Sequence, residues 1–516
     1  MRRSCPGSRF APWGGRCSAR WWCRSCRGSS ASGTRKSWCE RSGAGRRPRE
    51  APVIRRAPVI GLEVHARLRT ATKLFCGCPV RADAPPNTLV CPVCLGLPGA
   101  LPVPNREAVR LAVRLALALG ARVHPVSEWD RKNYFYPDLP KGYQITQQRR
   151  PLATGGALDI GPPSHPVPLQ RIHIEEDAGK SIHGRFPGGR TGLDFNRCGA
   201  PLVEVVTEPA LASPEEAERF LERLKATLVD LGVSDAEMEK GSLRCDANVS
   251  LGPGAARVEI KNLNSFRNVR RALAYEIERL AGADPGAADE TRAWDDRRRC
   301  TRRLRGKEHE FDYRYLPEPD LPPLRLRRAL LAAAGRNLPE PIHLRIERYL
   351  ALGVPSGPAR DLAHRPALAR YFDRAIGAGA AAREAAHWIL GEAAVIFGED
   401  GEAPRVPPET LAALVERVST GKLSHARARR ALRQAAGRGG DVLEWAEREA
   451  RESLGDQDIE ALCREILREA PDLLRRYRAG KTGLIDHFVG MGLRRSGGRA
   501  DPGRLRRRLE ALLRES

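Results

Sequence analysis

The sequence of 516 residues lacks two features of membrane and secreted proteins. It has no apolar run of the roughly 18 residues that a membrane span needs, and its start has no apolar core of a secretory signal. Both absences predict a soluble chain that works in the cytoplasm, away from any membrane. A Gly-x-x-x-x-Gly-Lys loop is also missing, so no motif of this sequence independently indicates ATP binding.

Acidic residues are few relative to basic ones. The chain has 63 Asp and Glu against 88 Lys and Arg, which gives a formal net charge of +25. A basic protein of this kind suits a nucleic-acid partner, because the phosphate backbone attracts positive charge. Arginine enrichment also accompanies a GC-rich coding sequence, so composition alone leaves both explanations open.

The first 56 residues lack any helical or strand periodicity. They hold 15 basic and two acidic residues, which accounts for +13 of the total charge of +25. This segment is predicted to be a disordered or mis-annotated leader. Methionine is absent between Met1 and Met238, so a later start would use a non-Met codon, with Val53 and Val59 as candidates. An organellar transit peptide, and with it a mitochondrial location, is the alternative.

Two close cysteine pairs, Cys-x-Cys and Cys-x-x-Cys, flank a Pro-rich loop of twelve residues, and they consist of Cys76, Cys78, Cys91 and Cys94. Two such pairs can close a tetrahedral thiolate site around zinc. Four thiolates leave no open coordination position, so the zinc is predicted to be structural. Free buried thiols or a disulfide are the alternatives, and a reducing cytosol disfavours the disulfide.

The stretch Val59–His65, VIGLEVH, alternates as a strand does. Its apolar residues would share one face, while Glu63 and His65 would share the other. A carboxylate beside an imidazole can ligate a divalent cation, and such hard sites suit magnesium or manganese. A solvent-facing hydrogen-bonded pair is the alternative.

A second stretch, Arg171–Glu208, carries three consecutive acids at Glu175–Asp177, flanked by His173 and His183, and it places Glu204 inside an apolar run. A carboxylate is costly to bury unless a cation, a proton or a hydrogen-bond donor meets it. Solvated surface acids are the alternative. VIGLEVH likewise places an acid within a largely apolar strand, and this second case favours a buried site.

The loop Trp129–Gln147 has no periodicity. Its three Tyr and one Phe interleave with Arg131, Lys132 and Lys141. This composition suits the binding of phosphate and of a nucleobase or an RNA end. An ordered loop whose aromatic side chains merely pack inward is the alternative.

The remaining patterns predict the fold class. Asn105 and Ser213 are predicted to cap helices, and GSLRCDANVSL and VEIKNLNSF alternate as strands. After the Pro-rich segment Phe311–Pro323 the chain reads as helical to its end, with basic faces that either contact phosphates or are simply solvated. The sequence therefore predicts an α+β protein with a mixed sheet followed by helices.

Several motifs, taken together and in order, resemble the B subunit of the tRNA-dependent amidotransferase. They are VIGLEVH, FCGC with CPVCLGLPGALPVPN, DRKNYFYPDLPKGYQI, RIHIEEDAGK, GSLRCDANVS, EIKNLNSFR and DYRYLPEPDLPP. The resemblance runs from about Val59 to the end and is dense up to Pro323. In the helical part HWILGEA, STGKLSHARA and GGRADP are still similar to family signatures.

The resemblance implies a domain plan. A mixed-sheet catalytic domain with the zinc loop would span residues 57–325, a helical domain 326–405, and a helical tail domain that reaches the tRNA 406–516. It also implies two partners, an amidase (A) subunit that releases ammonia from glutamine and a small C subunit.

The resemblance also implies a reaction. ATP would phosphorylate the side-chain carboxylate of Glu-tRNA(Gln) or Asp-tRNA(Asn), and ammonia would then displace the phosphate. The family's divalent-cation ligands map onto Glu63, His65, Glu176 and Glu204, and Lys132 is the candidate for a phosphate or substrate contact. Phe311 stands where family members usually have His. The alternatives are a zinc-stabilised RNA-binding protein without catalysis and a stand-alone metal-dependent ligase or hydrolase.

Overall fold

The computed structural model describes residues 57–515, apart from 82, 162, 185–186, 253–254, 283–287, 307–309, 399–403, 439, 452–453 and 498. The leader predicted over residues 1–56 lies outside these described residues. Among them, no helix is long and apolar enough to cross a membrane.

The middle strand of the main sheet is β1 (Val59–Arg67), and it has the predicted alternation. Ile60, Leu62 and Val64 are at most 1% exposed, while Glu63 and His65 lie half-buried on the opposite face. Successive side chains of a strand point to opposite faces, so β1 gives the sheet one apolar and one polar face.

Ten strands of the described chain form the main sheet. In spatial order nine of them are β15 (Cys300–Gly306), β14 (Glu290–Asp295), β13 (Val258–Lys261), β12 (Leu243–Ser250), β1, β11 (Pro201–Thr207), β8 (Pro166–Glu176), β6 (Ala153–Thr154) and β2 (Arg122–Val123), and β7 (Ala157–Asp159) also pairs with β8. The pair β13 and β14 is parallel, and the other pairings among these described strands are antiparallel. The sheet is therefore mixed, as predicted.

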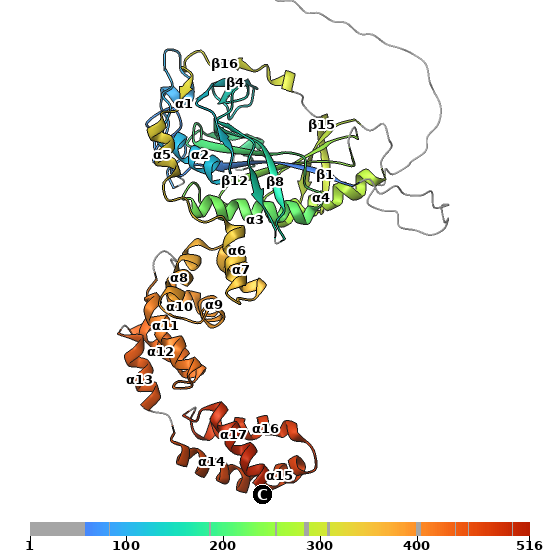
Figure 1. The fold of residues 1–516 in the computed structure, drawn as a ribbon. Coiled ribbons are helices and arrows are strands. Elements are labelled where there is room, and N and C mark those ends of the chain that lie inside the picture. Colours follow the sequence, from blue (N-terminus) through green and yellow to red (C-terminus); the bar gives the residue numbers. More distant parts are fainter. Residues whose placement is uncertain are drawn as a thin grey trace, which may run out of the picture. The chain divides into compact units, whose positions relative to one another are not determined.

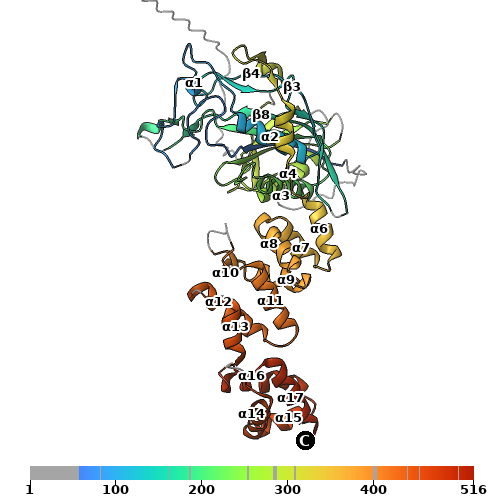
Figure 2. The same ribbon diagram turned by 60° about the vertical axis from the view of Figure 1, so that its left-hand side comes forward.

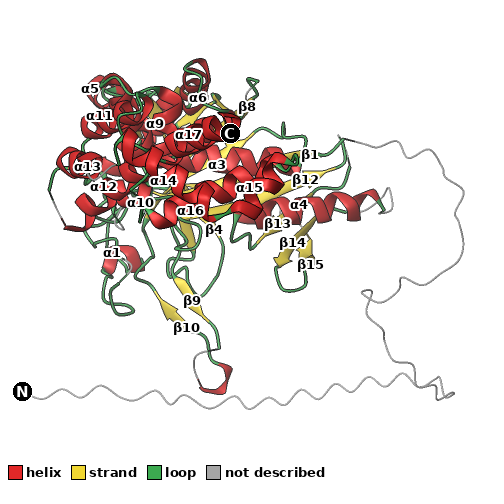
Figure 3. Cartoon of the chain, turned by 90° about the horizontal axis from the view of Figure 1, so that it is seen from below, coloured by secondary structure: helices red, strands yellow, loops and turns green. Residues whose placement is uncertain are grey.

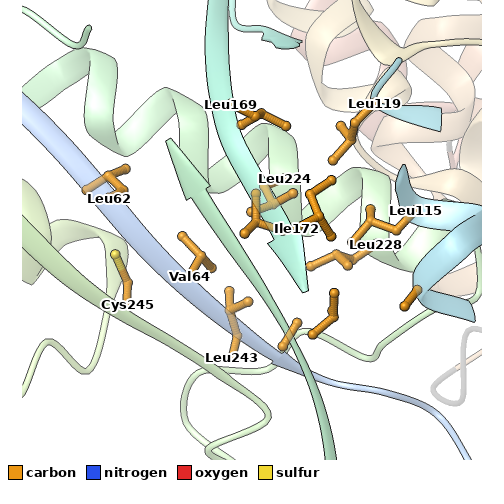
Figure 4. Close-up of a cluster of buried hydrophobic side chains, with 14 of the residues drawn as sticks. Leu62, Val64, Leu115, Leu119, Leu169, Ile172, Leu224, Leu228, Leu243 and Cys245 are labelled. Atoms are coloured by element: carbon orange, nitrogen blue, oxygen red, sulfur yellow. The ribbon is translucent and has the colours of Figure 1, made fainter. Parts of the chain in front are cut away.

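Three helices cover the apolar face: α2 (Arg106–Ala118), α3 (Pro214–Asp230) and α4 (Phe266–Ala281). Figures 1 and 2 both show α3 and α4 running along this face. In Figure 4, Val64, Ile172 and Leu243 from three strands meet Leu224 and Leu228 of α3. The core of this region therefore lies between the sheet and its helices.

The predicted helix caps are confirmed. The Asn105 side-chain oxygen accepts hydrogen bonds from the backbone N–H groups of Glu107 (2.8 Å) and Ala108 (3.2 Å) at the start of α2. The Ser213 hydroxyl accepts one from the backbone N–H of Glu216 at 3.2 Å at the start of α3. These bonds satisfy amide groups that have no partner inside a helix.

Smaller elements surround the main sheet. Strands β16 (Leu316–Pro317), β4 (Asp130–Asn133) and β5 (Tyr143–Thr146) form one sheet, and β3 (Val126–Ser127) pairs with β17 (Leu324–Arg325). The hairpin of β9 (Lys180–Ile182) and β10 (Gly192–Asp194) projects from the body of this region (Figure 3). Short α1 (Pro92–Leu95) belongs to the cysteine loop, and α5 (Arg328–Gly335) packs against α2.

The rest of the described chain is helical and contains two further hydrophobic cores. The first is built by α6 (Ile342–Ala351), α7 (Ser356–Ala363), α8 (Pro366–Gly377), α9 (Ala382–Gly391), α10 (Ala393–Phe397), α11 (Pro408–Ser419), α12 (His425–Arg438) and α13 (Val442–Arg451). The second is built by α14 (Asp456–Glu469), α15 (Pro471–Arg478), α16 (Ile485–Arg495) and α17 (Pro502–Glu515). Single-turn 3₁₀ helices lie at Pro187–Gly189, Glu310–Tyr313 and Thr482–Leu484.

The predicted order, a mixed sheet followed by helices, is confirmed. Helices from both sides of residue 405 contribute to the first helical core. The division into domains at 325 and 405 stays a prediction.

The packing between the sheet and α3 leads to a stability prediction. Leu224→Ala should lower the free energy of unfolding by about 2–5 kcal/mol, because Leu224 is 1% exposed and its truncation leaves a cavity. Val229→Ala on the same helix is the control. Val229 is 37% exposed, so its truncation should cost less than about 1 kcal/mol. Chemical denaturation of the purified chain measures both, and equal effects would contradict this packing.

Candidate functional site

The polar face of the sheet gathers two imidazoles and two carboxylates on three neighbouring strands. Antiparallel register pairs His65 of β1 with Glu204 of β11, and pairs Glu204 with His173 of β8. The Glu204 carboxylate lies 3.3 Å from His65 Nε2 and 2.9 Å from His173 Nε2. Paired residues of neighbouring strands share one face of a sheet, so strand register alone brings these three side chains together.

Glu175 completes the cluster. It lies two residues beyond His173 on β8, hence on the same face, and its carboxylate is 3.1 Å from His65 Nε2. The hydroxyl of Thr146 on β5 donates to it at 3.3 Å. His65, Glu175 and Glu204 each offer one ligand atom within 4.8 Å of the others, so they could hold a metal ion.

The charges of this cluster are mutually dependent. Burial opposes the charged form of every member, yet Glu204 and Glu175 raise the pKa of both His65 and His173 above the usual range. In return the imidazoles hold the pKa of Glu204 well below its ordinary value and lower that of Glu175 to about 2, although burial opposes both shifts. Each carboxylate is stable inside the protein because positive charge lies beside it.

Glu176 does not join this cluster. As the neighbour of Glu175 in β8 it points to the other side of the strand, where it pairs with the ammonium of Lys141. It also accepts the backbone N–H of Ile145 at 2.9 Å. The structure thus brings together His65 and Glu204 from the predicted ligand set, and Glu175 lies beside them where Glu176 was expected.

Glu63 and Lys132 line the same pocket, which has a volume of about 590 Å³. Glu63 accepts a hydrogen bond from the Asn248 amide at 3.0 Å, and burial followed by the nearby Glu204 raises its pKa. Lys132 of β4 lies over the ring of Tyr313 at 4.8 Å. Burial would lower its pKa, but Tyr315 and the cluster carboxylates outweigh burial and raise it, so the ammonium stays charged.

Two nitrogens at this pocket are buried without a hydrogen-bond partner in the described chain: His173 Nδ1 and Arg171 Nε. Buried polar atoms are normally satisfied. Together with the carboxylate- and imidazole-rich lining, these atoms fit a pocket that receives a charged, hydrogen-bonding ligand.

The four cysteines also come together, as their spacing predicts. Their sulfur atoms all lie within 4.8 Å of one another, in a cluster that could hold a metal ion. Cys91 caps the short helix α1, and the backbone N–H of Cys91 donates to the Cys94 sulfur at 3.2 Å. A compact set of four sulfurs matches what a tetrahedral thiolate site requires.

A buried cation lies against this thiol cluster. Lys73 is 0% exposed, and its ammonium donates to Cys94 Sγ at 3.5 Å and to the Leu89 carbonyl at 2.8 Å. The Cys76 thiol, the Cys91 backbone and the Lys73 charge together lower the pKa of Cys94 to about 4, against the effect of burial. The cluster thus favours the thiolate at Cys94, while hydrogen bonding to Cys94 and burial raise the pKa of Cys76, and burial raises that of Cys78 to about 11.

The aromatic loop between Trp129 and Gln147 is partly sheet. Its strands β4 and β5 carry Lys132 and Thr146 into the pocket, while Phe135 and Tyr136 at the turn are 78% and 51% exposed. The loop therefore does not simply pack inward. The side chain of Phe311 lies outside the described residues.

Comparison with known proteins gives two family matches. Residues 58–332 match the GatB/GatE catalytic domain, and residues 370–513 match the GatB domain. The B subunit of the aspartyl/glutamyl-tRNA(Asn/Gln) amidotransferase from a strain of Thermus thermophilus is 46% identical over 470 residues, which is 88% of this chain and 98% of that protein. The B subunits from Moorella thermoacetica and Anaeromyxobacter sp. are 43% and 44% identical, covering 88% and 86% of this chain and 99% and 96% of their own lengths.

The mixed sheet, its buried polar cluster and these matches define a chain with a GatB/GatE catalytic domain and a helical extension. The chain belongs to the family of aspartyl/glutamyl-tRNA(Asn/Gln) amidotransferase B subunits. The resemblance inferred from its sequence motifs is confirmed, and the catalytic-domain match favours an enzyme subunit over a non-catalytic RNA-binding protein.

The different placements of Glu175 and Glu176 give a direct test. If the His65–Glu175–Glu204 cluster holds a cation, Glu175→Gln should weaken Mn²⁺ binding at least tenfold, because it removes one of the two carboxylates that could bind the ion. Glu176→Gln is the matched control and should leave Mn²⁺ binding nearly unchanged. Electron paramagnetic resonance titration of free Mn²⁺ measures both. Weaker binding in the Glu176 variant alone would restore the ligand set predicted from the sequence.

Proposed function

We propose that this chain activates the side-chain carboxylate of glutamate or aspartate esterified to tRNA(Gln) or tRNA(Asn). A carboxylate oxygen attacks the γ-phosphorus of ATP and ADP leaves, which produces an acyl phosphate. Ammonia then attacks the acyl carbon, the carbon–oxygen bond to phosphate breaks, and an amide forms with loss of a proton. The observation that carries this proposal is the family match together with a buried cluster of imidazole and carboxylate groups beside a charged lysine.

The chain's own residues have separate tasks in this proposal. His65, Glu175 and Glu204 hold a divalent cation, Mg²⁺ or Mn²⁺, and the donor set of two carboxylates and one imidazole suits such an ion. When bound, the ion neutralises phosphate charge and so favours phosphoryl transfer. Lys132 contacts a phosphate or the substrate carboxylate, and Glu63 with Asn248 supports the pocket wall.

Zinc is proposed for the thiol cluster. Four sulfur ligands leave no open position, so the metal has a structural role and does not meet substrate. The buried Lys73 offsets the excess negative charge of a tetrathiolate site.

The proposal includes partners. Ammonia is supplied by an amidase subunit, and a small third subunit completes the assembly, as the resemblance to the family implies. The C-terminal helices contact the tRNA. The assembly works in the bacterial cytoplasm.

A charge-removing substitution tests the phosphoryl-transfer step. Glu204→Gln keeps the side-chain shape and should lower tRNA-dependent ATP hydrolysis on the order of 10²–10³-fold, the usual cost of removing one charge interaction from the transition state. Glu278→Gln changes an exposed glutamate of α4 and should have no effect. The assay uses the complex with its partner subunits and Glu-tRNA(Gln), with glutamine hydrolysis as the check on assembly. Near-normal ATP turnover in the Glu204 variant at low Mg²⁺ would refute this assignment.

Metal analysis tests the thiol cluster. Protein purified without chelator should contain one zinc per chain, and Cys91→Ser should lower both the zinc content and the melting temperature, because the metal stabilises the loop. Cys300→Ser is the control, since Cys300 is a half-buried cysteine outside the cluster. Wild-type protein without zinc and with four freely reactive loop thiols would contradict the proposal.

A further inference from the structure

Buried residues alternate along β8, but the alternation changes phase at Gln170. The residues that face the hydrophobic core are odd-numbered before this point and even-numbered after it. They are at most 2% exposed and consist of Val167, Leu169, Ile172 and Ile174. A regular strand keeps one phase, because successive side chains point to opposite faces. One extra residue must therefore lie in the middle of β8.

The pairing of β8 with β11 identifies this residue. Val206 of β11 pairs with Arg171, whereas the next residue, Thr207, pairs with Leu169, so Gln170 has no partner on β11. Such a β-bulge redirects the side chains that follow it, and bulges are frequent next to active sites. Here the bulge turns Arg171 and the cluster residues beyond it to the polar face of the sheet.

The strand register also places Arg171 beside the metal-binding cluster. Glu63, Val206 and Arg171 form one row across β1, β11 and β8. The adjoining row consists of His65, Glu204 and His173. Two residues along a strand cover about 6.6 Å, so only one short step separates the two rows. The long side chain of Arg171 can therefore reach a group that is bound over the cluster, and Arg171 lines the same pocket.

Arg171 is a half-buried cation without a counter-ion in the part of the chain that the structure describes. Its Nε is buried without a hydrogen-bond partner, and its guanidinium forms no ion pair with a described residue. By contrast, Lys261 of the same pocket lies 2.8 Å from both Asp246 and Glu259. Buried donors are normally satisfied. The guanidinium is therefore suited to an acceptor that a bound ligand supplies.

The chemistry of the guanidinium narrows the choice of ligand. Its planar set of N–H donors can bind two oxygens of one phosphoryl group at once, and the pairing of two charges strengthens these hydrogen bonds. A phosphoryl group in transfer spreads its negative charge over three oxygens, so it gains from positive groups on more than one side. The His65–Glu175–Glu204 cluster and Lys132 offer two such positions, and Arg171 offers a third.

We propose that Arg171 is a further catalytic residue, which donates hydrogen bonds to the oxygens of the γ-phosphoryl group while this group moves from ATP to the substrate carboxylate. The bond between the γ-phosphorus and ADP breaks as the bond to the carboxylate oxygen forms. Arg171 stays protonated throughout and transfers no proton. This inference rests on the proposed function and adds a residue to the same site.

The first test measures ATP hydrolysis by the complete complex with its partner subunits and Glu-tRNA(Gln). Arg171→Ala should lower kcat on the order of 10²–10³-fold, the usual cost of losing one charge interaction with the transition state, and should leave the KM for ATP nearly unchanged. Arg171→Lys keeps the charge but loses the planar donor set, so it should recover only part of the rate. Arg122→Ala is the control, since Arg122 is an exposed arginine of β2 outside the pocket.

Two further measurements separate a catalytic role from a structural one. Guanidinium ion added to the Arg171→Ala complex should restore at least tenfold of the lost rate, because it can occupy the space of the missing group, while it should not stimulate the wild type. Aluminium fluoride imitates the phosphoryl group in transfer, so it should tighten the binding of ADP to the wild type. Arg171→Ala should bind ADP alone normally and lose most of this gain. Glutamine hydrolysis and melting curves check assembly and folding.

The outcomes distinguish this inference from the proposed function. Normal ATP turnover in Arg171→Ala would overturn the inference and leave the proposed function intact. A lower rate without rescue by guanidinium, with a lower melting temperature or weaker binding of ADP alone, would mean a structural role and would also overturn it. A raised KM for Glu-tRNA(Gln) at unchanged kcat would assign Arg171 to the substrate carboxylate instead. A wild-type complex that hydrolyses no ATP with charged tRNA would refute the proposed function, and this inference with it.

Discussion

Charge compensation inside the sheet is the constraint on which this protein's active region depends. Glu204 is only 6% exposed, and a buried carboxylate is stable there because His65 and His173 lie on the strands to either side of it. The arrangement needs β1, β11 and β8 in one particular register. A shift by one residue would turn each of these side chains to the apolar face, against α2, α3 and α4. The polar cluster thus requires the same strand pairing that builds the hydrophobic core.

A second buried charge pair connects this cluster to the cysteine loop. The pocket on the other side of β8 is lined by Glu176 and Lys141 together with Cys76 and Cys94. Lys141 passes close to Gly96, where a Cβ atom would lie 2.3 Å from the lysine side chain and the backbone has φ of +71°. Only glycine meets both conditions. The cysteine loop therefore has a role beyond its own stability, because its backbone shapes the space in which the Lys141–Glu176 pair is held.

The helical region uses charge differently. Near the sheet, Arg345 of α6 pairs with Asp230 of α3 at 2.7 Å, and both side chains are buried, which ties the first helical core to the sheet region. Further along the chain, the buried Glu392 at the start of α10 pairs with Arg429 at 2.9 Å and with Arg433 at 3.2 Å, both on α12. In both places a buried charge is held by an opposite charge on another helix, so the ion pairs join separate elements of the chain.

The sequence by itself determined the features that depend on local spacing. The alternation of VIGLEVH predicted which face of β1 carries Glu63 and His65, Asn105 and Ser213 predicted two helix starts, and the spacing of the cysteines predicted a four-sulfur cluster. Each of these depends on residues within a turn, a strand or one short loop, where geometry follows from the periods of the backbone. Applied to β8, the same alternation would have placed Glu175 with His173 and Glu176 on the opposite side, but the ligand set expected from the family resemblance contained Glu176.

Tertiary structure decided what depends on long-range pairing. The register of β1 with β11 and of β11 with β8 determines which imidazole lies beside which carboxylate. The pairing of β1 with β11 joins His65 to Glu204, which are more than 100 residues apart in the chain. The pairing of Glu176 with Lys141 is of the same kind, since it joins β8 to the loop before β5. The local periodicity of the sequence does not specify these long-range pairings. They form only when the whole sheet and its helices pack together, because only then is the entropy cost of closing the long loops recovered.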